Sequence, residues 1–502
     1  MKLKILITVL FSLWAIALQA QHNFLTKKQI NEDIEFLTST LNDKSSYTYL
    51  NGYNFNTDFE NYLKTIGDTT KLEDFGLFIT KTLAKIGDRH SSLTTIRGYS
   101  LNESLFLPYM YAPHNGKVVV LNLNQNKEFK ILNPKFPYLK KIDGMEIKDF
   151  LQKTRPEDIE APEETYFTMA VRDIRDIQKN YTILNKPLPK QVKLTLSDVA
   201  FKKDTTILVS PVDRSNRLRP WDEKFESKYV LVDDEEYNKP EIIKQLFKIK
   251  DSIAYIKIPA MSSKGEAPLL FDELNSFMKS IRNDSKALII DVRSNSGGTR
   301  DLIYEFANYL VHPDSVYVVN ATKQRATVPL LEEYIERLHG RFLFSYSELT
   351  KREQASVDTF LKTFKPMYEL DDKKFSEYYF GLFNGQKLSE QSFYYNKPVY
   401  ILANEKTFSA ASVFVSVFKG IPNIQIVGVT TDGSSGNSEW FDLPNSELFG
   451  KISTMVSFQK NGKIFDGYGT EPDIKIERDM NQILWKSDTQ LKKLKSLIRT
   501  ED

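Results

Sequence analysis

Residues 399–420, VYILANEKTFSAASVFVSVFKG, are the most informative part of this chain. The apolar run at 399–402 predicts a buried strand, and a second apolar run from Ala410 predicts a helix. The turn between them places Ser409 at the start of the helix, where free N–H groups and the helix dipole favour negative charge. Many enzymes present a serine nucleophile in this way, but serine is also a favoured helix N-cap. The stretch alone leaves both interpretations open.

The chain has 502 residues, a length typical of two to four domains. With 41% apolar and 12% aromatic residues, its composition is that of a folded globular protein and not of a disordered one. It contains no cysteine, which excludes disulfides, thiolate metal sites and lipidation at an N-terminal cysteine. Such a protein depends on its hydrophobic core for stability.

The N-terminal sequence, MKLKILITVLFSLWAIALQAQ, has the features of a secretory signal peptide. Lys2 and Lys4 form a short basic region, an apolar run follows at residues 5–18, and Ala20 supplies a small residue before a cleavage site. This run is short for a membrane span, and an uncleaved anchor is the alternative. We expect residues 1–20 to be removed, leaving no integral membrane segment. The protein is then expected to be periplasmic or secreted, in a Gram-negative bacterium.

The mature chain is expected to be close to neutral. The full sequence has 68 Lys and Arg against 66 Asp and Glu, and residues 1–20 hold two lysines and no acid. A balanced charge provides no basic surface for nucleic acid. The basic cluster at residues 490–499 fits the solvated face of a terminal helix. We therefore expect no nucleic-acid partner.

Changes in apolar periodicity divide the mature chain into three parts. Residues 21–100 carry three helical stripes and predict a small helical domain. Residues 101–205 are β-rich, and the Asp-Gly pair at 143–144 between apolar runs predicts a hairpin. Across residues 206–502 strands alternate with helices, which predicts an α/β catalytic layer. An aromatic and charged segment at about residues 320–395 interrupts this layer and is expected to be an insertion.

A serine nucleophile needs a base within hydrogen-bond reach, and the chain has five histidines. His90 has the most suitable context, in GDRHSS at the exit of the third predicted helix. His22 lies at the mature N-terminus, and His114 lies in a loop. His312 and His339 are expected at helix ends. His90 is therefore the candidate base, although a polar turn with one histidine is more often structural.

The segment DVRSNSGG follows a buried strand at residues 287–292. Its adjacent glycines, Gly297 and Gly298, let backbone N–H groups approach a ligand closely. The alternative is a simple strand-to-helix turn. A phosphate-binding loop is excluded because the lysine that would follow is absent. The amide of Gly297 or Gly298, together with that of Ala410, is expected to form an oxyanion hole.

Four blocks in order, DVRSNSGG, TFSAAS, IVGVTTDGSSG and YGTEPDI, together resemble the tail-specific or C-terminal processing serine proteases. The resemblance covers most of residues 250–475. It implies an α/β fold with a ClpP/crotonase-like catalytic core. It also implies an N-terminal helical domain and a PDZ-like β-rich module, of which the IDGMEI hairpin forms part. The TFSAAS block of this family carries the nucleophile, which maps onto Ser409.

The resemblance also bears on the other catalytic residues. Members with a Ser-Lys dyad carry a lysine after the nucleophile, but residues 433–436 are GSSG. The tricorn-like branch uses Ser-His-acid instead, which places the base on His90. Counting three residues back from Gly469 places the acid on Asp466.

Other residues remain candidates for these roles. Glu471 and Asp88 are rival acids, the first within the YGTEPDI block and the second close to His90 in sequence. Lys406, three residues before Ser409, is a rival base. A lysine base must be desolvated to lower its pKa, and this position looks exposed.

The resulting hypothesis is an exported serine endopeptidase that acts on peptide or protein substrates through an acyl-enzyme. It needs neither a metal nor another cofactor. A non-catalytic peptide- or lipophile-binding protein on the same scaffold is the alternative, and the missing lysine motivates it. The separation of Ser409 from His90 discriminates between the two.

Overall fold

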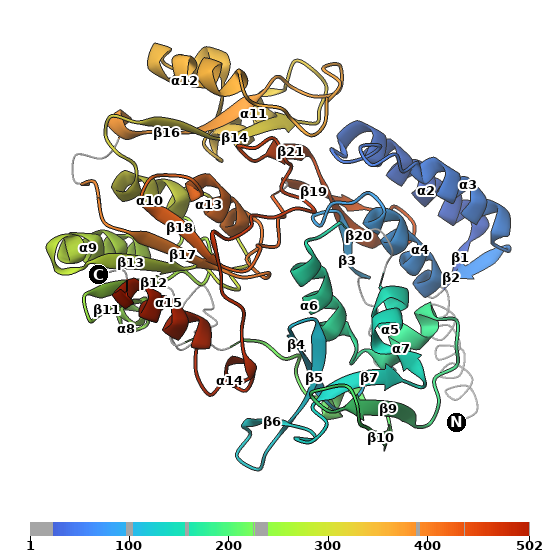
Figure 1. Ribbon diagram of the computed structural model, residues 1–502. Coiled ribbons are helices and arrows are strands. Elements are labelled where there is room, and N and C mark those ends of the chain that lie inside the picture. The colour runs from blue at the N-terminus through green and yellow to red at the C-terminus, as the bar shows by residue number, and fades with distance from the viewer. Residues whose placement is uncertain are drawn as a thin grey trace, which may run out of the picture.

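The computed structural model describes residues 24–96, 104–155, 160–223, 225, 239–387, 392–435 and 437–500 (Figure 1). The predicted signal peptide and His22 lie outside the described residues. The fold is mixed α/β, as predicted. Within the described ranges, every helix is too short or too polar to cross a membrane.

A mainly parallel six-stranded sheet forms the catalytic layer, with β11 as its antiparallel edge. Its order is β11 (Phe247–Lys250), β12 (Ile253–Lys257), β13 (Ala287–Asp291), β17 (Val399–Ala403), β18 (Ile424–Gly428) and β22 (Ile474–Lys475). Side chains alternate between its two faces because strand periodicity is two. One face packs against α9 (Pro268–Asp284), α10 (Asp301–Leu310) and α13 (Ala410–Phe418), and the other against α15 (Thr489–Thr500). The expected strand and helix around Ser409 are confirmed.

The N-terminal helices share a hydrophobic core with strands near the other end of the chain. Phe75 and Leu83 pack in one cluster with Leu448 and Phe458. The segment after α4 (Leu72–Ala84) also contacts the C-terminal part of the chain. There β3 (Ser92–Ile96) pairs with β20 (Leu448–Ser453) in a three-stranded sheet. Figure 1 shows this sheet beside the N-terminal helices. The elements are α2 (Lys27–Lys44), α3 (Phe55–Thr65), α4 (Leu72–Ala84), β3 (Ser92–Ile96), β19 (Ser438–Asp442) and β20 (Leu448–Ser453), with a small pair β1 (Phe24–Thr26) and β2 (Thr69–Lys71). This packing carries His90 to the catalytic layer.

The β-rich module is an antiparallel sheet with three helices, and it lies at one end of the molecule (Figure 1). The predicted hairpin is confirmed: Asp143 and Gly144 both have positive φ, 43° and 82°, and join β7 to β8. The strands are β4 (Met110–His114), β5 (Lys117–Leu123), β6 (Phe129–Ile131), β7 (Tyr138–Ile142), β8 (Met145–Glu146), β9 (Val192–Ser197) and β10 (Asp204–Val209). The helices are α5 (Ile147–Thr154), α6 (Glu163–Asp173) and α7 (Ile177–Ile183).

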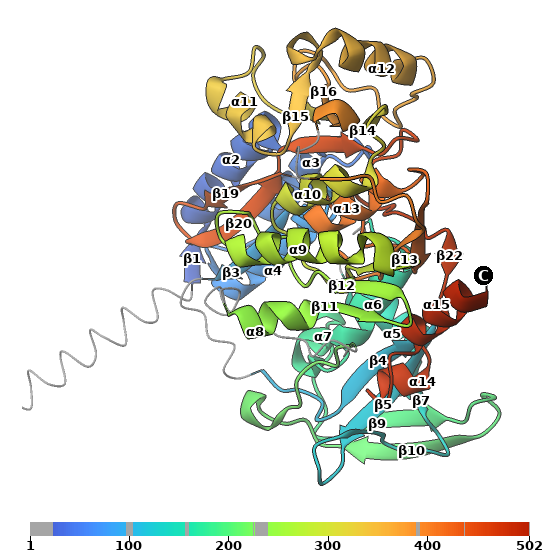
Figure 2. The same cartoon turned by 90° about the vertical axis from the view of Figure 1, so that its left-hand side faces the viewer.

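The expected insertion forms a second layer at the opposite end from the β-rich module (Figure 2). Its sheet has the order β15-β16-β14-β21, so a strand from the C-terminal part of the chain completes it. The elements are β14 (Val316–Gln324), α11 (Glu332–His339), β15 (Leu343–Ser345), α12 (Lys351–Leu361), β16 (Tyr379–Asn384) and β21 (Met455–Phe458). Two short helices, α8 (Pro240–Ile243) and α14 (Met480–Ile483), complete the architecture. The domain boundaries expected from the sequence stay predictions.

Candidate active site

Ser409 lies on a strained turn between β17 and α13. Its φ of 53° and ψ of −127° are unusual for a residue with a Cβ atom. Two hydrogen bonds to the segment after β13 fix this turn. Thr407 Oγ1 donates to Val292 O at 3.0 Å, and Phe408 N donates to Asn295 O at 2.9 Å. The Ser409 side chain makes no capping hydrogen bond. Ser409 therefore occupies the N-cap position of α13 without capping the helix through its side chain, and the hydroxyl is left for another partner.

That partner is the imidazole of His90, whose Nε2 lies 3.3 Å from Ser409 Oγ. The Asp88 carboxylate fixes the turn that carries the ring, since its Oδ1 accepts from His90 N and Ser91 N at 2.9 and 2.7 Å. The ring also stacks on Phe408, with 5.0 Å between centroids. The structure thus brings together two predicted residues that are 319 positions apart.

The environment keeps His90 uncharged. Only 4% of the residue is exposed. Burial, followed by the positive charges of Lys451, Arg89 and Arg341, lowers the pKa of His90 to about 3. A neutral imidazole can accept a proton from Ser409 Oγ, as a general base must.

The glycine turn approaches the serine closely. A Cβ atom on Gly297 would lie 2.6 Å from Ser409 Cβ, so no larger residue fits there. The Gly297 N–H is already engaged, because it donates to Asn295 Oδ1 at 2.9 Å. Because this N–H is engaged, Gly297 does not supply the oxyanion donor that we expected from the sequence. The amides of Gly298 and Ala410 have no hydrogen-bond partner among the described residues and remain the candidate donors.

Asp466 is fully buried, and the Tyr47 hydroxyl donates to its Oδ2 at 2.7 Å. Its Oδ1 and the Nδ1 of His90 are both buried without a hydrogen-bond partner in the part of the chain that the structure describes. Burial, followed by the charge of Asp88, raises the pKa of Asp466 to about 7. Its role as the orienting acid stays a prediction.

The rival acids occupy different surroundings. Asp88 Oδ1 also accepts from Ser453 Oγ at 2.5 Å, so this carboxylate serves to hold the His90 turn. Glu471 is exposed, and its backbone carbonyl accepts from Lys419 Nζ. Neither has a hydrogen bond to the His90 ring among those that the described residues form.

Asp466→Asn is expected to stabilise the protein more at pH 8 than at pH 5. A carboxyl with a pKa raised from 3.8 to about 7 on folding stabilises the native state below pH 4, and this contribution is lost as the pH rises through 7. Asparagine removes the buried charge, so its gain in unfolding free energy should be roughly 2–3 kcal/mol larger at pH 8. Urea denaturation at both pH values measures this. Equal gains would contradict it, and Asp314→Asn, with an 86% exposed side chain, is the control.

The lysine alternatives are engaged elsewhere. Lys406 forms an ion pair with Asp222. Lys460 is half-buried at the far end of α13, where it donates to the carbonyls of Val417 and Lys419. Burial lowers the pKa of Lys460 to about 8, but it is separated from Ser409 by the length of the helix.

The other described histidines also have local partners. His339 contacts Glu348 at 2.7 Å, and His114 Nδ1 lies 2.9 Å from the Tyr138 hydroxyl. His312 is half-exposed at the edge of the insertion. None of them replaces His90 as the base of Ser409.

Two residues that position the site were not singled out from the sequence. Asn295 lies within the DVRSNSGG block and receives the Gly297 N–H, a role that the block itself could have suggested. Tyr47 lies in a helix-to-helix connection without a motif, and only the fold places it on Asp466. Across the described ranges, no group of three or more His, Cys, Asp or Glu side chains could hold a metal ion.

Comparisons with known proteins identify a family and related chains. Residues 252–476 match the model of Peptidase family S41. A Chlamydia trachomatis serovar D protein is 24% identical over 268 residues, which cover 49% of this chain and 44% of that protein. A Chlamydia muridarum protein described as uncharacterized is 28% identical over 107 residues, 21% of this chain and 18% of that protein. The matches thus span less than half the length of these curated relatives.

Solved structures extend the likeness over the whole fold. Mature CPAF superposes with a TM-score of 0.64 at 15% identity, covering 95% of this chain and 98% of that chain. CPAF in complex with lactacystin gives a TM-score of 0.63 at 16% identity, covering 95% and 99% of the two chains. At this identity the likeness shows a shared fold.

Proposed function

We propose that this chain is an exported serine endopeptidase. The match of residues 252–476 to the model of Peptidase family S41 supports a serine-type peptidase. The observation that carries the proposal is the 3.3 Å contact between His90 Nε2 and Ser409 Oγ. It joins a hydroxyl on a strained turn to a neutral buried imidazole, which is the arrangement that activates a serine nucleophile. The same contact favours catalysis over a purely binding role on this scaffold.

The reaction begins when Ser409 Oγ attacks the carbonyl carbon of a peptide bond and His90 Nε2 takes its proton. The carbonyl oxygen becomes an oxyanion, and the N–H groups of Gly298 and Ala410 hold it. The intermediate collapses as the C–N bond breaks, and His90 returns the proton to the leaving amine. An acyl-enzyme on Ser409 remains.

Water then attacks the acyl-enzyme, with His90 again accepting the proton. The second oxyanion forms in the same hole and collapses to release the carboxylic acid and the free Ser409 hydroxyl. In this scheme Asp466 acts through His90. Its Oδ1 and the Nδ1 of His90, both without a partner among the described residues, would form a hydrogen bond that fixes the tautomer and stabilises the imidazolium. No metal is used in this scheme.

Export is proposed from the N-terminal sequence, with its two early lysines and the apolar run at residues 5–18. The absence of cysteine means that the mature protein would fold without disulfides in an oxidising compartment. Substrates would then be peptides or unfolded proteins in the periplasm or outside the cell.

Hydrolysis of an internally quenched, unstructured peptide tests this function. The variant Gly297→Ala tests the assigned oxyanion hole. The added methyl would lie 2.6 Å from Ser409 Cβ and 3.0 Å from Ala410 N. We expect kcat to fall by about 10²- to 10³-fold, the cost of losing one oxyanion donor.

The matched control is Gly265→Ala, where nothing lies within 4 Å of the added methyl. It should keep its activity. Cleavage at an unchanged rate by Gly297→Ala would contradict the assigned oxyanion hole, and no cleavage by the unaltered protein would contradict the function.

A further inference from the structure

Two arginines near the proposed site have no acidic partner among the residues that the structure describes. Arg300 is 7% exposed, and its Nη1 donates to Asn320 Oδ1 at 3.5 Å and to the Arg341 carbonyl at 3.3 Å. Arg341 donates to the Arg337 carbonyl at 3.1 Å and to Asn437 Oδ1 at 2.6 Å. Neither guanidinium forms an ion pair with any described residue. Buried charges are normally paired, so this pair requires an explanation.

Other buried arginines of the same catalytic layer follow the usual rule. Arg293 bridges Asp291 and Asp488 at 2.7 and 2.6 Å. Arg478 bridges Glu223 and Glu405. Burial and the charge of Arg341 lower the pKa of Arg300 to about 10, but the group stays charged at neutral pH. Arg300 therefore carries an uncompensated buried charge.

Each of the two arginines has one link to the reacting groups. Arg300 follows Gly297 by three residues, and Gly297 lies against Ser409. Between Gly297 and Arg300, the buried Oγ1 of Thr299 has no hydrogen-bond partner in the described part of the chain. Arg341 is close enough to His90 for its charge to lower the pKa of the imidazole. Two guanidinium groups without an acidic partner among the described residues, and one hydroxyl without a hydrogen-bond partner there, thus lie in the neighbourhood of the Ser409–His90 pair.

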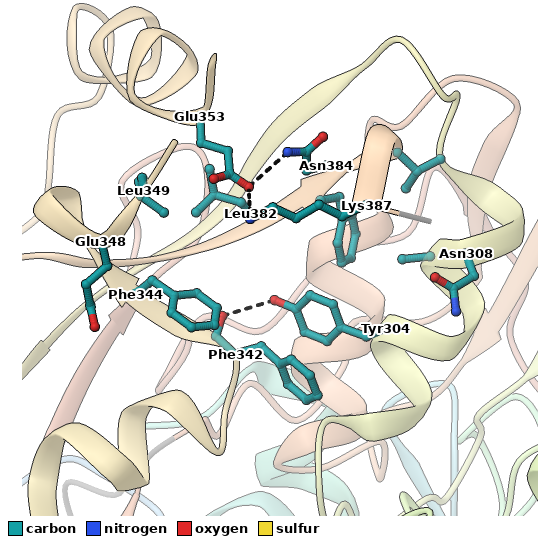
Figure 3. A pocket seen from close by; sticks show the side chains of 13 residues that line it. Tyr304, Asn308, Phe342, Phe344, Glu348, Leu349, Glu353, Leu382, Asn384 and Lys387 are labelled. Carbon is teal, nitrogen blue, oxygen red and sulfur yellow. Dashed lines mark hydrogen bonds and ion pairs between the residues drawn. The ribbon is translucent and has the colours of Figure 1, made fainter. Parts of the chain in front are cut away.

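Aromatic packing joins α10 to the segment that follows Arg341, and Figure 3 shows the two rings, Tyr304 and Phe342, next to each other. Tyr304 lies one helical turn after Arg300 on α10, and its ring stacks on Phe342, with 4.0 Å between centroids. The Tyr304 hydroxyl also donates to Phe342 O at 3.1 Å. These contacts fix the loop that carries Arg341 against α10, so the two guanidinium groups are preorganised.

We propose that Arg300 and Arg341, with the Thr299 hydroxyl, bind a substrate carboxylate within one or two residues of the scissile bond. Guanidinium forks match carboxylate geometry, and a bound carboxylate would neutralise the buried charge. This inference rests on the proposed function and specifies its substrate class: peptides with Asp or Glu next to the cleaved bond. A free C-terminal carboxylate has the same chemistry and is distinguished below.

Binding to the full-length mature Ser409→Ala variant tests the subsite without requiring turnover. The probes are Ac-Ala-Glu-Ala-amide, Ac-Ala-Gln-Ala-amide and Ac-Ala-Gln-Ala with a free C-terminus, each titrated by isothermal calorimetry or NMR. The glutamate amide should bind about 10- to 100-fold more tightly than the glutamine amide, as a charge-assisted hydrogen-bond pair allows. Tight binding of only the free-acid peptide would support the carboxylate subsite with a C-terminal source. Equal affinity for all three would overturn the proposal.

Arg341→Gln in the same background should reduce the preference for glutamate to within about threefold. Arg341 is half-buried, so its removal is expected to be tolerated, and the thermal midpoint checks this. Arg300→Lys, which keeps the charge but loses the fork, should give an intermediate preference. Arg499→Gln, which breaks an exposed pair with Asp251, is the charge-matched control and should keep the full preference. A preference that survives Arg341→Gln would also overturn the proposal.

Cleavage-site profiling separates this proposal from the proposed function. The unaltered protein is incubated with a proteome-derived peptide mixture, and cleavage sites are identified by mass spectrometry. Cleavage enriched in Asp or Glu near the cut bond, and not enriched with Arg341→Gln, supports both proposals. Cleavage without acidic enrichment supports the peptidase and overturns the subsite. Absence of cleavage, with glutamate-selective binding retained, overturns the peptidase alone.

Discussion

Ser409→Ala should abolish peptide hydrolysis, with kcat falling by about 10⁴-fold or more. Nucleophile and base act as a unit, so removal of either leaves only the contribution of the oxyanion hole and binding. The variant should remain folded, because the Ser409 side chain makes no capping bond that the helix would lose. The measurements are the steady-state rate on a quenched peptide and the unfolding midpoint in urea.

Covalent labelling adds a direct readout. A fluorophosphonate probe should modify the unaltered protein on Ser409 and leave Ser409→Ala unlabelled, as intact-mass and peptide spectra would show. Ser416→Ala is the matched control, since Ser416 lies on the same helix and is also buried. Its hydroxyl has one long contact, 3.4 Å to Gln459 Oε1, so activity should persist. Hydrolysis that survives in purified Ser409→Ala would assign the nucleophile to another residue.

Local patterns predicted most of the catalytic layer. The apolar run at 399–402 and the helix after Ser409 are observed within one residue, because both are buried and their periodicity is set by packing. The Asp143–Gly144 hairpin followed from its turn chemistry, since both positions need positive φ. These features depend on contacts between neighbours in sequence.

The contacts between distant segments were less predictable. That His90 reaches Ser409 depends on the core shared by α4 with β20 and β21, and apolar periodicity does not say which stripes meet. The engagement of the Gly297 N–H by Asn295 could not be inferred from two adjacent glycines. The surroundings of Arg300 and Arg341 could not be predicted for the same reason. An arginine without an acidic partner is recognised only when its neighbours in space are known.

His90→Gln should lower kcat at pH 7 by about 10⁴-fold or more while fluorophosphonate labelling slows in parallel. Glutamine can occupy the volume of the ring but cannot accept the Ser409 proton. His312→Gln is the control, since His312 is half-exposed and lies outside the site. Undiminished hydrolysis by His90→Gln would show that His90 is not the general base.

The pH profile identifies which group sets the acid limb. The ratio kcat/KM reports ionisations of the free enzyme, and the pKa of His90 is lowered to about 3, so the imidazole stays neutral from pH 8 to pH 5. The pKa of Asp466 is raised to about 7, so its carboxylate is neutralised as the pH falls through 7. If Asp466 stabilises the imidazolium, kcat/KM should fall about tenfold per pH unit below 7. Asp466→Asn should be slower and should lose this limb. A limb near pH 6.5 that persists in Asp466→Asn would belong to His90, and its ring would then be more accessible to protons than its burial implies.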